Sequence, residues 1–121
     1  MDSAFELNGQ QVVYAAVGDD YVSRTLVERV SKAPYLIAQA CYESKLTEQA
    51  DVILPVTTWA EQEGHYVNLD GRTQKAQKAL IPPETVWDNL AVLNILAEHM
   101  NVPLGTDWQE SILARKSSVA I

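Results

Sequence analysis

The chain has 121 residues, enough for one domain with one hydrophobic core. Its net charge of −7, without a lysine or arginine cluster, argues against nucleic acid and acidic membrane surfaces as partners. The single cysteine, Cys41, excludes an internal disulfide and a multi-cysteine iron–sulfur site on this chain, and it fits a cytoplasmic location. No apolar run approaches the ~20 residues needed to span a bilayer, and the first residues have no signal-peptide pattern.

The first third of the chain is expected to form a strand, a loop and a helix. Residues 1–10 show no periodicity and are expected to be a leader. The apolar, β-rich run 11–17 predicts a buried strand, and Gly-Asp-Asp at 18–20 predicts a tight loop after it. From Tyr21 the apolar residues recur at helical spacing, which predicts an amphipathic helix that ends near Ala33, before a proline.

Two more strands follow at short intervals. Residues 35–38 and 52–54 are apolar runs that predict buried strands, and the second is expected to stop at Pro55. Between them, a short helix is predicted over 44–50 with Ser44 as its N-cap. Three strands separated by helices predict a parallel βαβαβ unit. So small a parallel sheet could be half of a larger one, which leaves an apolar face exposed and favours self-association.

The second half begins with a helical turn predicted over 59–64 and closed by Gly64. A small hairpin is expected at 66–75 around Asp70-Gly71, because Asp-Gly is a strong tight-turn signal. After two prolines, a helix is predicted from Thr85 to residue 100, with Trp87 and Leu90 assigned to the core.

The predicted fold is therefore α/β: a three-layer Rossmann-like segment with a short parallel sheet of about three strands, a small hairpin and a C-terminal helix. We predict an α/β domain over 11–103. A capping-box pattern at 106–109 predicts a last short helix within a C-terminal segment, 104–121.

Two places in this pattern suit a binding site. Gly18, Asp19 and Asp20 lie at a strand-to-helix junction, where backbone N–H groups suit a phosphate and carboxylates suit ribose or guanine. The other interpretation is a turn with an N-cap aspartate, which spacing alone favours. Arg72 follows the tight turn; it is either an anion clamp or a residue that holds the hairpin by binding carbonyl groups.

The remaining chemical groups point to no catalytic or metal site. Glu61 and Glu63 could form an acid/base pair, but their spacing favours two solvated carboxylates. His65 and His99 have no further ligands at metal-binding spacing. Cys41 follows a strand end without an adjacent basic residue, which favours an inert structural thiol.

Three blocks at fixed spacing add a family resemblance. They are Ala-Asp-Val-Ile-Leu-Pro at 50–55, Trp-Ala-Glu-Gln-Glu-Gly at 59–64 and Asn-Leu-Asp-Gly-Arg-Thr-Gln at 68–74. Together they closely resemble a signature of the molybdopterin oxidoreductase superfamily, and the likeness extends over about residues 11–103. In that family the blocks belong to the third domain, one of two Rossmann-like halves that enclose a bis-guanine-dinucleotide molybdenum or tungsten cofactor.

The resemblance implies which residues would meet that cofactor. Gly18, Asp19 and Asp20 would face one guanine dinucleotide, Gln39 would lie near it, and Arg72 would sit at the wall of the cofactor funnel. Several polar positions of the family pattern are changed in this chain. The changed residues include Ala40, Leu46 and His65.

The Gly-Arg pair at 71–72 looks more like the sequence of the large iron–sulfur protein of NADH-quinone oxidoreductase, its G subunit, than like that of formate dehydrogenases. The homologous domain of that subunit is thought to have lost the cofactor. The first hypothesis is therefore a non-catalytic structural α/β domain of a protein like this large iron–sulfur subunit. The alternative is the molybdopterin guanine dinucleotide-binding domain of an enzyme such as formate dehydrogenase. A stand-alone nucleotide-binding module is the third hypothesis.

The first hypothesis carries further expectations. The chain alone would have no oxidoreductase activity, no catalytic or metal-binding residues and no cofactor of its own, whereas its parent protein would be an oxidoreductase. Its partners would be the remainder of the large subunit and neighbouring respiratory-complex subunits, without nucleic acid and without membrane insertion. Its location would be cytoplasmic, peripheral to the inner membrane through the parent complex.

Overall fold

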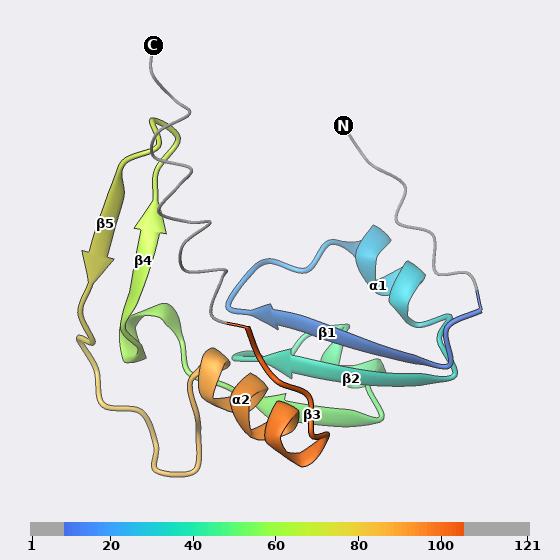
Figure 1. The fold of residues 1–121 in the computed structure, drawn as a ribbon. Helices are drawn as coiled ribbons and strands as arrows, with labels where there is room; N and C mark the ends of the chain where they lie inside the picture. Colours follow the sequence, from blue (N-terminus) through green and yellow to red (C-terminus); the bar gives the residue numbers. More distant parts are fainter. Residues whose placement is uncertain (1–8, 106–121) are drawn as a thin grey trace.

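The computed structural model describes residues 9–105 and shows a parallel sheet beside a separate hairpin (Figure 1). This arrangement confirms the α/β class, the three-stranded parallel sheet, the small hairpin and the C-terminal helix. The predicted last helix and most of the predicted leader lie outside the described residues. The elements are β1 Val12–Gly18, α1 Arg24–Val30, β2 Tyr35–Ala40, the 3-10 turn η1 Thr47–Gln49, β3 Val52–Pro55, the 3-10 turn η2 Trp59–Glu61, β4 Gly64–Val67, β5 Thr73–Ala76 and α2 Asn89–His99.

The hydrophobic core lies on one face of the sheet. The strands are parallel in the order β1-β2-β3, with Val13 opposite Leu36 and Ala38 opposite Ile53. Because side chains alternate along a strand, these residues share the face that α1 covers. Burying an aliphatic side chain completely stabilises the fold by about 1.5–3 kcal/mol. The buried cluster consists of Val13, Val27, Val30, Leu36, Ala38 and Leu46.

The other face of the sheet carries Tyr14, Ala16 and Gln39 and is approached by α2, through Asn89. This face is less well covered: Val12 is 54% exposed. Figure 1 shows α2 on the β2–β3 side of the sheet, away from β1.

Both helices begin three to four residues later than their apolar periodicity predicted, at side chains that cap them. α1 begins at Arg24 instead of Tyr21, because the Ser23 hydroxyl accepts a hydrogen bond from the Leu26 N–H at 3.2 Å. α2 begins at Asn89 instead of Thr85, because the Asp88 carboxylate accepts from the Ala91 N–H at 2.7 Å. A side chain that satisfies the free N–H groups of the first turn fixes where a helix starts.

The assignment of Trp87 and Leu90 to the core is wrong. Their side chains are 55% and 45% exposed. Residue 87 is held by its backbone instead, since it forms an isolated parallel bridge with Val56 and its carbonyl accepts from the Thr57 N–H at 3.0 Å. The chain therefore runs along the edge of the sheet before it turns into α2.

The segment between β2 and β3 corrects two further predictions. β2 continues to Ala40, and the helix predicted over 44–50 is only the turn Thr47–Gln49. The Thr47 hydroxyl binds both the N–H and the carbonyl of Ser44, at 2.8 and 2.9 Å, and such local bonds compete with a regular helix. β3 is only partly buried, with Ile53 50% exposed, and it includes Pro55 because it is an edge strand.

The hairpin around the Asp-Gly turn is confirmed. β4 pairs with β5 in antiparallel fashion, and the Asn68 side-chain oxygen accepts from the N–H groups of Asp70 at 3.0 Å and Arg72 at 2.8 Å. Gly71 supplies the positive φ of +76° that the turn needs. The prediction that Gly64 closes the preceding helical turn is wrong: that turn ends at Glu61, and Gly64 begins β4.

Candidate functional site

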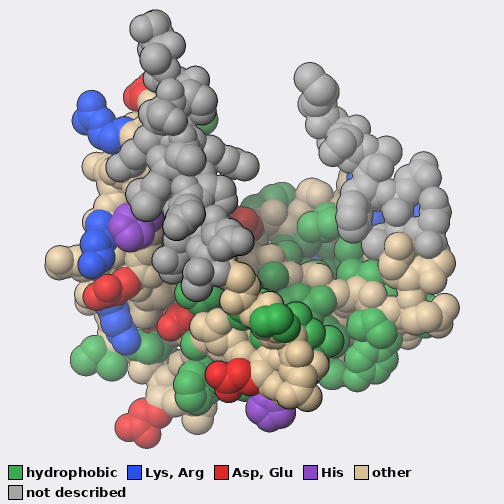
Figure 2. Space-filling view, viewed as in Figure 1, with side chains coloured by type: hydrophobic (Ala, Val, Ile, Leu, Met, Phe, Trp, Pro, Cys, Tyr) green, Lys and Arg blue, Asp and Glu red, His purple; other side chains and the backbone are tan. Residues whose placement is uncertain are grey.

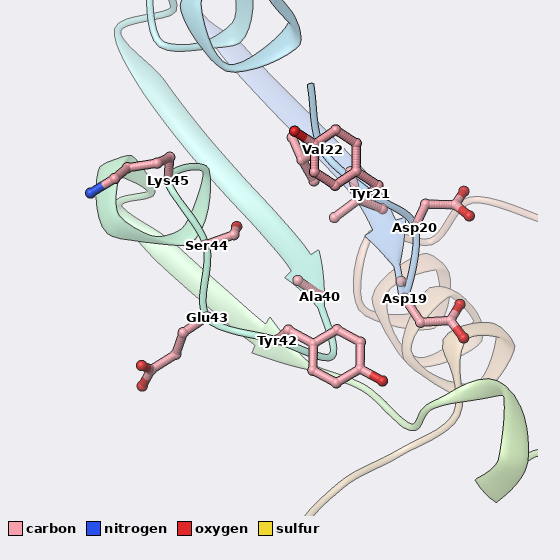
Figure 3. Close-up of a pocket in the computed structure, with 11 residues that line it drawn as sticks. Asp19, Asp20, Tyr21, Val22, Ala40, Tyr42, Glu43, Ser44 and Lys45 are labelled. Atoms are coloured by element: carbon pink, nitrogen blue, oxygen red, sulfur yellow. The ribbon is translucent and has the colours of Figure 1, made fainter. Parts of the chain in front are cut away.

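An open cleft of about 500 Å³ lies at the carboxyl ends of β1 and β2. It is lined by residues 17–22, from the end of β1 and the loop after it, and by Ala40 with residues 42–45, from the end of β2 and the loop after it (Figure 3). Ligand sites of open α/β sheets are found beyond the carboxyl ends of the strands, so this is the place where a ligand is expected. Three of the five predicted site residues, Gly18, Asp19 and Asp20, line the cleft.

Gly18 is favoured by the conformation of the backbone. Its φ is +55°, a left-handed conformation that favours glycine. A Cβ atom at this position would lie 3.4 Å from the side-chain amide nitrogen of Asn89. This distance is an ordinary van der Waals contact, so the positive φ, and not the closeness of α2, accounts for the glycine, and it does so without a ligand.

Asp19 is also engaged by the fold. Its carboxylate accepts a hydrogen bond from the Trp59 N–H at 3.0 Å, which ties the end of β1 to η2, 40 residues further along the chain. Asp20 is exposed, and its backbone N–H donates to the Val17 carbonyl at 3.0 Å. Figure 3 shows both carboxylates at the end of β1, while Tyr42 comes from the loop after β2.

Gln39 lies inside the protein, with 1% of its surface exposed, and it does not line the cleft. Its side-chain oxygen accepts a hydrogen bond from the Tyr14 hydroxyl. Its amide nitrogen donates to the Asn89 side-chain oxygen at 2.6 Å and to the Asn89 carbonyl at 3.3 Å. Asn89 in turn donates to the Gln62 side chain at 3.4 Å. The polar chain from Tyr14 through Gln39 and Asn89 to Gln62 thus joins the sheet to α2 and to the base of the hairpin.

Arg72 lies in the turn of the hairpin and does not line the cleft. Its backbone N–H donates to Asn68, and its carbonyl accepts from the Asn68 N–H at 3.0 Å. Figure 1 shows the hairpin as an arm whose turn points away from the sheet. The structure therefore does not bring Arg72 together with the Gly-Asp-Asp loop.

The charge of the cleft is acidic. Asp19, Asp20 and Glu43 line it, against a single cation, Lys45. The Lys45 ammonium lies 2.7 Å from the Glu48 carboxylate, so part of its charge is already compensated. Carboxylates can accept hydrogen bonds from ribose or guanine, but they repel phosphate.

Cys41 follows β2 beside this cleft. Burial, together with the nearby carboxylates of Asp19 and Glu61, raises the pKa of its thiol to about 11. The thiol donates to the Thr57 carbonyl at 3.0 Å. A thiol that stays protonated at neutral pH is a poor nucleophile and a poor metal ligand, which supports the prediction of an inert thiol.

A second open cleft of about 520 Å³ lies between the start of α2 and the base of the hairpin. Glu61 and Glu63 both line it, but the Glu61 carboxylate binds the Thr58 N–H at 2.9 Å and caps η2. His65 lines this cleft as well, whereas His99 is outside it. Within residues 9–105 no group of three or more histidine, cysteine or acidic side chains is placed to hold a metal ion.

Sequence reasoning missed Asn89, the residue that joins Gln39 and Gln62. One signal was available. Gln39 is a polar residue within an otherwise apolar strand, and a buried amide needs a hydrogen-bond partner. The sequence does not indicate that the partner comes 50 residues later.

The sequence of the chain is similar to one protein family and to several known proteins. The family model described as molybdopterin oxidoreductase matches residues 2–99. The G subunit of NADH-quinone oxidoreductase from Rickettsia conorii is 33% identical over 84 residues, which are 69% of this chain. The mitochondrial NADH-ubiquinone oxidoreductase 78 kDa subunit of Candida albicans is 30% identical over 75% of the chain. The F420-dependent formate dehydrogenase subunit alpha of Methanocaldococcus jannaschii is 32% identical over 65% of it.

These relatives are much longer proteins. The matched region amounts to 12% of the Rickettsia protein, 13% of the Candida protein and 12% of the Methanocaldococcus protein. None of the described helices is long and apolar enough to cross a bilayer.

Proposed function

The chain belongs to the molybdopterin oxidoreductase family, and within that family we propose that it is a non-catalytic structural α/β segment of a protein like the large iron–sulfur subunit of NADH-quinone oxidoreductase. Its role is to pack against the rest of a large respiratory subunit, whose complex transfers electrons from NADH to quinone. Its partners are the remainder of that subunit and the neighbouring subunits. Its place is the cytoplasmic side of the membrane, where the complex holds it.

One observation carries this proposal: the positions that the family resemblance assigns to the cofactor hold this fold together. Gly18 supplies a left-handed backbone conformation, Asp19 binds the backbone of Trp59, and Gln39 binds Tyr14 and Asn89. The buried Gln39 amide is bound at both its oxygen and its nitrogen, and the Asp19 carboxylate already has one partner in the fold. These contacts support a structural role.

The charge of the cleft argues against a guanine dinucleotide as its ligand. The pyrophosphate of such a ligand needs N–H donors or cations. The lining carries three acidic residues, Asp19, Asp20 and Glu43, and one cation, Lys45, which is paired with Glu48. Gln39 and Arg72, the other two residues that the resemblance assigns to the cofactor, do not line the cleft.

The second candidate remains a guanine-dinucleotide-binding domain such as that of a molybdopterin formate dehydrogenase. The position of the cleft favours it, because nucleotides bind beyond the carboxyl ends of parallel strands. Likeness to the F420-dependent formate dehydrogenase subunit alpha agrees with it.

A titration with GDP, monitored by the backbone amide resonances of residues 18–20, separates the two candidates. We expect no saturable shift, because the fold already uses Asp19 and Gln39 and because the acidic cleft repels phosphate. Saturable shifts confined to the cleft would favour the cofactor-binding domain and overturn the structural proposal.

A control variant, Asp20→Asn with Glu43→Gln, removes two negative charges from the exposed lining of the cleft. If the internal use of Asp19 and Gln39 is what prevents binding, GDP also leaves this variant unchanged. Binding by the variant alone would show that charge, and not the engaged side chains, closes the cleft to nucleotide.

A further inference from the structure

The turn of the hairpin contains the single Asp-Gly sequence of the chain, Asp70-Gly71. Aspartate followed by glycine is the sequence at which a polypeptide backbone rearranges most readily, because glycine has no side chain to hinder its nitrogen from approaching the aspartate carboxyl group. Leu69 and Asp70 are exposed at the tip of the hairpin. Figure 2 shows charged side chains gathered over the hairpin, as is typical of a surface in contact with water.

We propose that Asp70 is a modification site at which this backbone rearranges to isoaspartate, and that the side chain of Asn68 controls the rate. In the first step, the Gly71 nitrogen attacks the carboxyl carbon of the protonated Asp70 side chain. A C–N bond forms, the nitrogen loses its hydrogen, the carboxyl group loses its hydroxyl, and the two leave together as water. The product is a cyclic succinimide.

Water completes the rearrangement by opening the ring. If it breaks the new C–N bond, aspartate is restored. If it breaks the original peptide bond instead, the main chain runs through the side-chain carbon of residue 70, which is isoaspartate. The water that is consumed replaces the water that was released, so the two steps need no oxidant and no cofactor.

The folded turn holds the attacking nitrogen away from the reaction. The Gly71 N–H donates a hydrogen bond to the Asn68 carbonyl at 3.0 Å, and the φ of Gly71 is +76°. The Gly71 nitrogen must leave this partner before it can close a ring on Asp70. The reaction therefore starts from an opened turn, and its rate follows the population of that open state.

The Asn68 side chain keeps the turn closed. Its oxygen accepts hydrogen bonds from the Asp70 N–H at 3.0 Å and from the Arg72 N–H at 2.8 Å, on both sides of the reacting peptide bond. The Asp70 carboxylate is held less tightly, by a long hydrogen bond of 3.5 Å from the Asn68 amide. The carboxyl group is thus free to move, whereas the backbone that it must meet is fixed by Asn68.

The rearrangement changes the hairpin. Isoaspartate adds one carbon atom to the main chain between residues 70 and 71. The Asn68 oxygen then no longer reaches both of its N–H partners in the same turn. Val67 and Thr73, the pair of residues next to the turn, lose the connection that closes β4 on β5. A converted chain therefore has a hairpin that is open at its tip.

This proposal does not depend on the proposed function or on what packs against the sheet, because its contacts all lie within residues 68–72. The test is to incubate the 121-residue chain at neutral pH in water labelled with heavy oxygen. Each ring opening leaves one heavy oxygen atom in residue 70, and peptide mass spectrometry locates it. Asp51, which is followed by the branched Val52, is the internal reference and should stay unlabelled.

Variants test the control by Asn68. Asn68→Ala removes two hydrogen bonds from the turn and should raise the rate of labelling at Asp70 by about fivefold or more. Asn68→Asp keeps an acceptor oxygen at this position and should label at nearly the original rate. The matched control Gln74→Ala, an exposed change in the same hairpin, should leave the rate unchanged. A synthetic peptide of residues 66–74 gives the rate without the folded turn and should be the fastest.

Two results would overturn the proposal. If Asp70 gains no more heavy oxygen than Asp51, even in the Asn68→Ala variant, Asp70 is not a site of rearrangement. If the intact chain reacts as fast as the peptide, or if Asn68→Ala leaves the rate unchanged, the hydrogen bonds of Asn68 do not control the reaction.

Discussion

The two faces of the parallel sheet are held in different ways. On one face, α1 buries Val27 and Val30 against Leu36, and the contact is apolar. On the other face, the one buried residue of α2 is Ala97, while Leu93 is 36% exposed. α2 is attached by the polar chain and the bridge at Trp87 instead. The comparison shows that an apolar sequence does not ensure that a helix is buried, and that a few hydrogen bonds can fix where it lies.

A helix that is apolar on most sides belongs between two layers. Only four of the eleven residues of α2 are polar: Asn89, Asn94, Glu98 and His99. Its exposed leucine and isoleucine side chains agree with a helix that packs against a further part of a larger protein.

The largest expected loss of unfolding free energy comes from the apolar packing, which differs between the two faces of the sheet. Leu36→Ala removes a side chain that is 2% exposed and should lower the free energy of unfolding by about 2–5 kcal/mol. Leu93→Ala, on α2, should lower it by about 1 kcal/mol or less. Urea denaturation monitored by circular dichroism measures both. Equal losses would show that α2 is packed as tightly as α1.

A smaller loss of unfolding free energy is expected when the series of hydrogen-bonded side chains from Tyr14 to Gln62 is interrupted. Asn89→Ala leaves the buried amide of Gln39 without its side-chain partner and with only the longer bond to the residue 89 carbonyl, which should cost about 1–3 kcal/mol of unfolding free energy. In a double-mutant cycle with Gln39→Ala, the two changes should couple by about 0.5–3 kcal/mol. Asn94→Ala, an exposed change on the same helix, is the control and should be nearly neutral. Additive losses at positions 39 and 89 would contradict the link.

The smallest effect concerns the two N-caps. Asp88→Ala and Ser23→Ala each remove the side chain that satisfies a first-turn N–H, at a cost of about 1 kcal/mol. Amide hydrogen exchange should reveal the difference between the helices: α2 loses protection in the first variant, whereas α1 keeps most of its protection in the second because its packing holds it. Equal loss of protection in both helices would argue against this difference.

The parts of the fold that sequence predicts are those with local causes. The apolar run at 11–17 and the Asp-Gly turn each contain their own signal, and both are found where expected. The starts of the helices were missed because apolar spacing continues past the capping residues Ser23 and Asp88.

Distant causes explain the other errors. Trp87 lies outside the predicted helix because its carbonyl accepts a hydrogen bond from the Thr57 N–H, and Thr57 precedes the hairpin in the sequence. Gln39 faces inward because Asn89 reaches it. Gly18 and Asp19 were found as a conspicuous pair. The sequence could not show that what lies next to them is Asn89 and Trp59 of this chain and not a ligand.

The positions of two of the three tryptophans bear on what fluorescence can report about this protein. Trp59 and Trp87 are 60% and 55% exposed, and both lie outside the cluster under α1. An indole that already meets water changes its emission little when the chain unfolds. The small change that these two residues show reports the detachment of the hairpin base and of α2, and the opening of the apolar core alone adds little to it. Agreement between fluorescence and circular dichroism would then be direct evidence that both sides of the sheet unfold together.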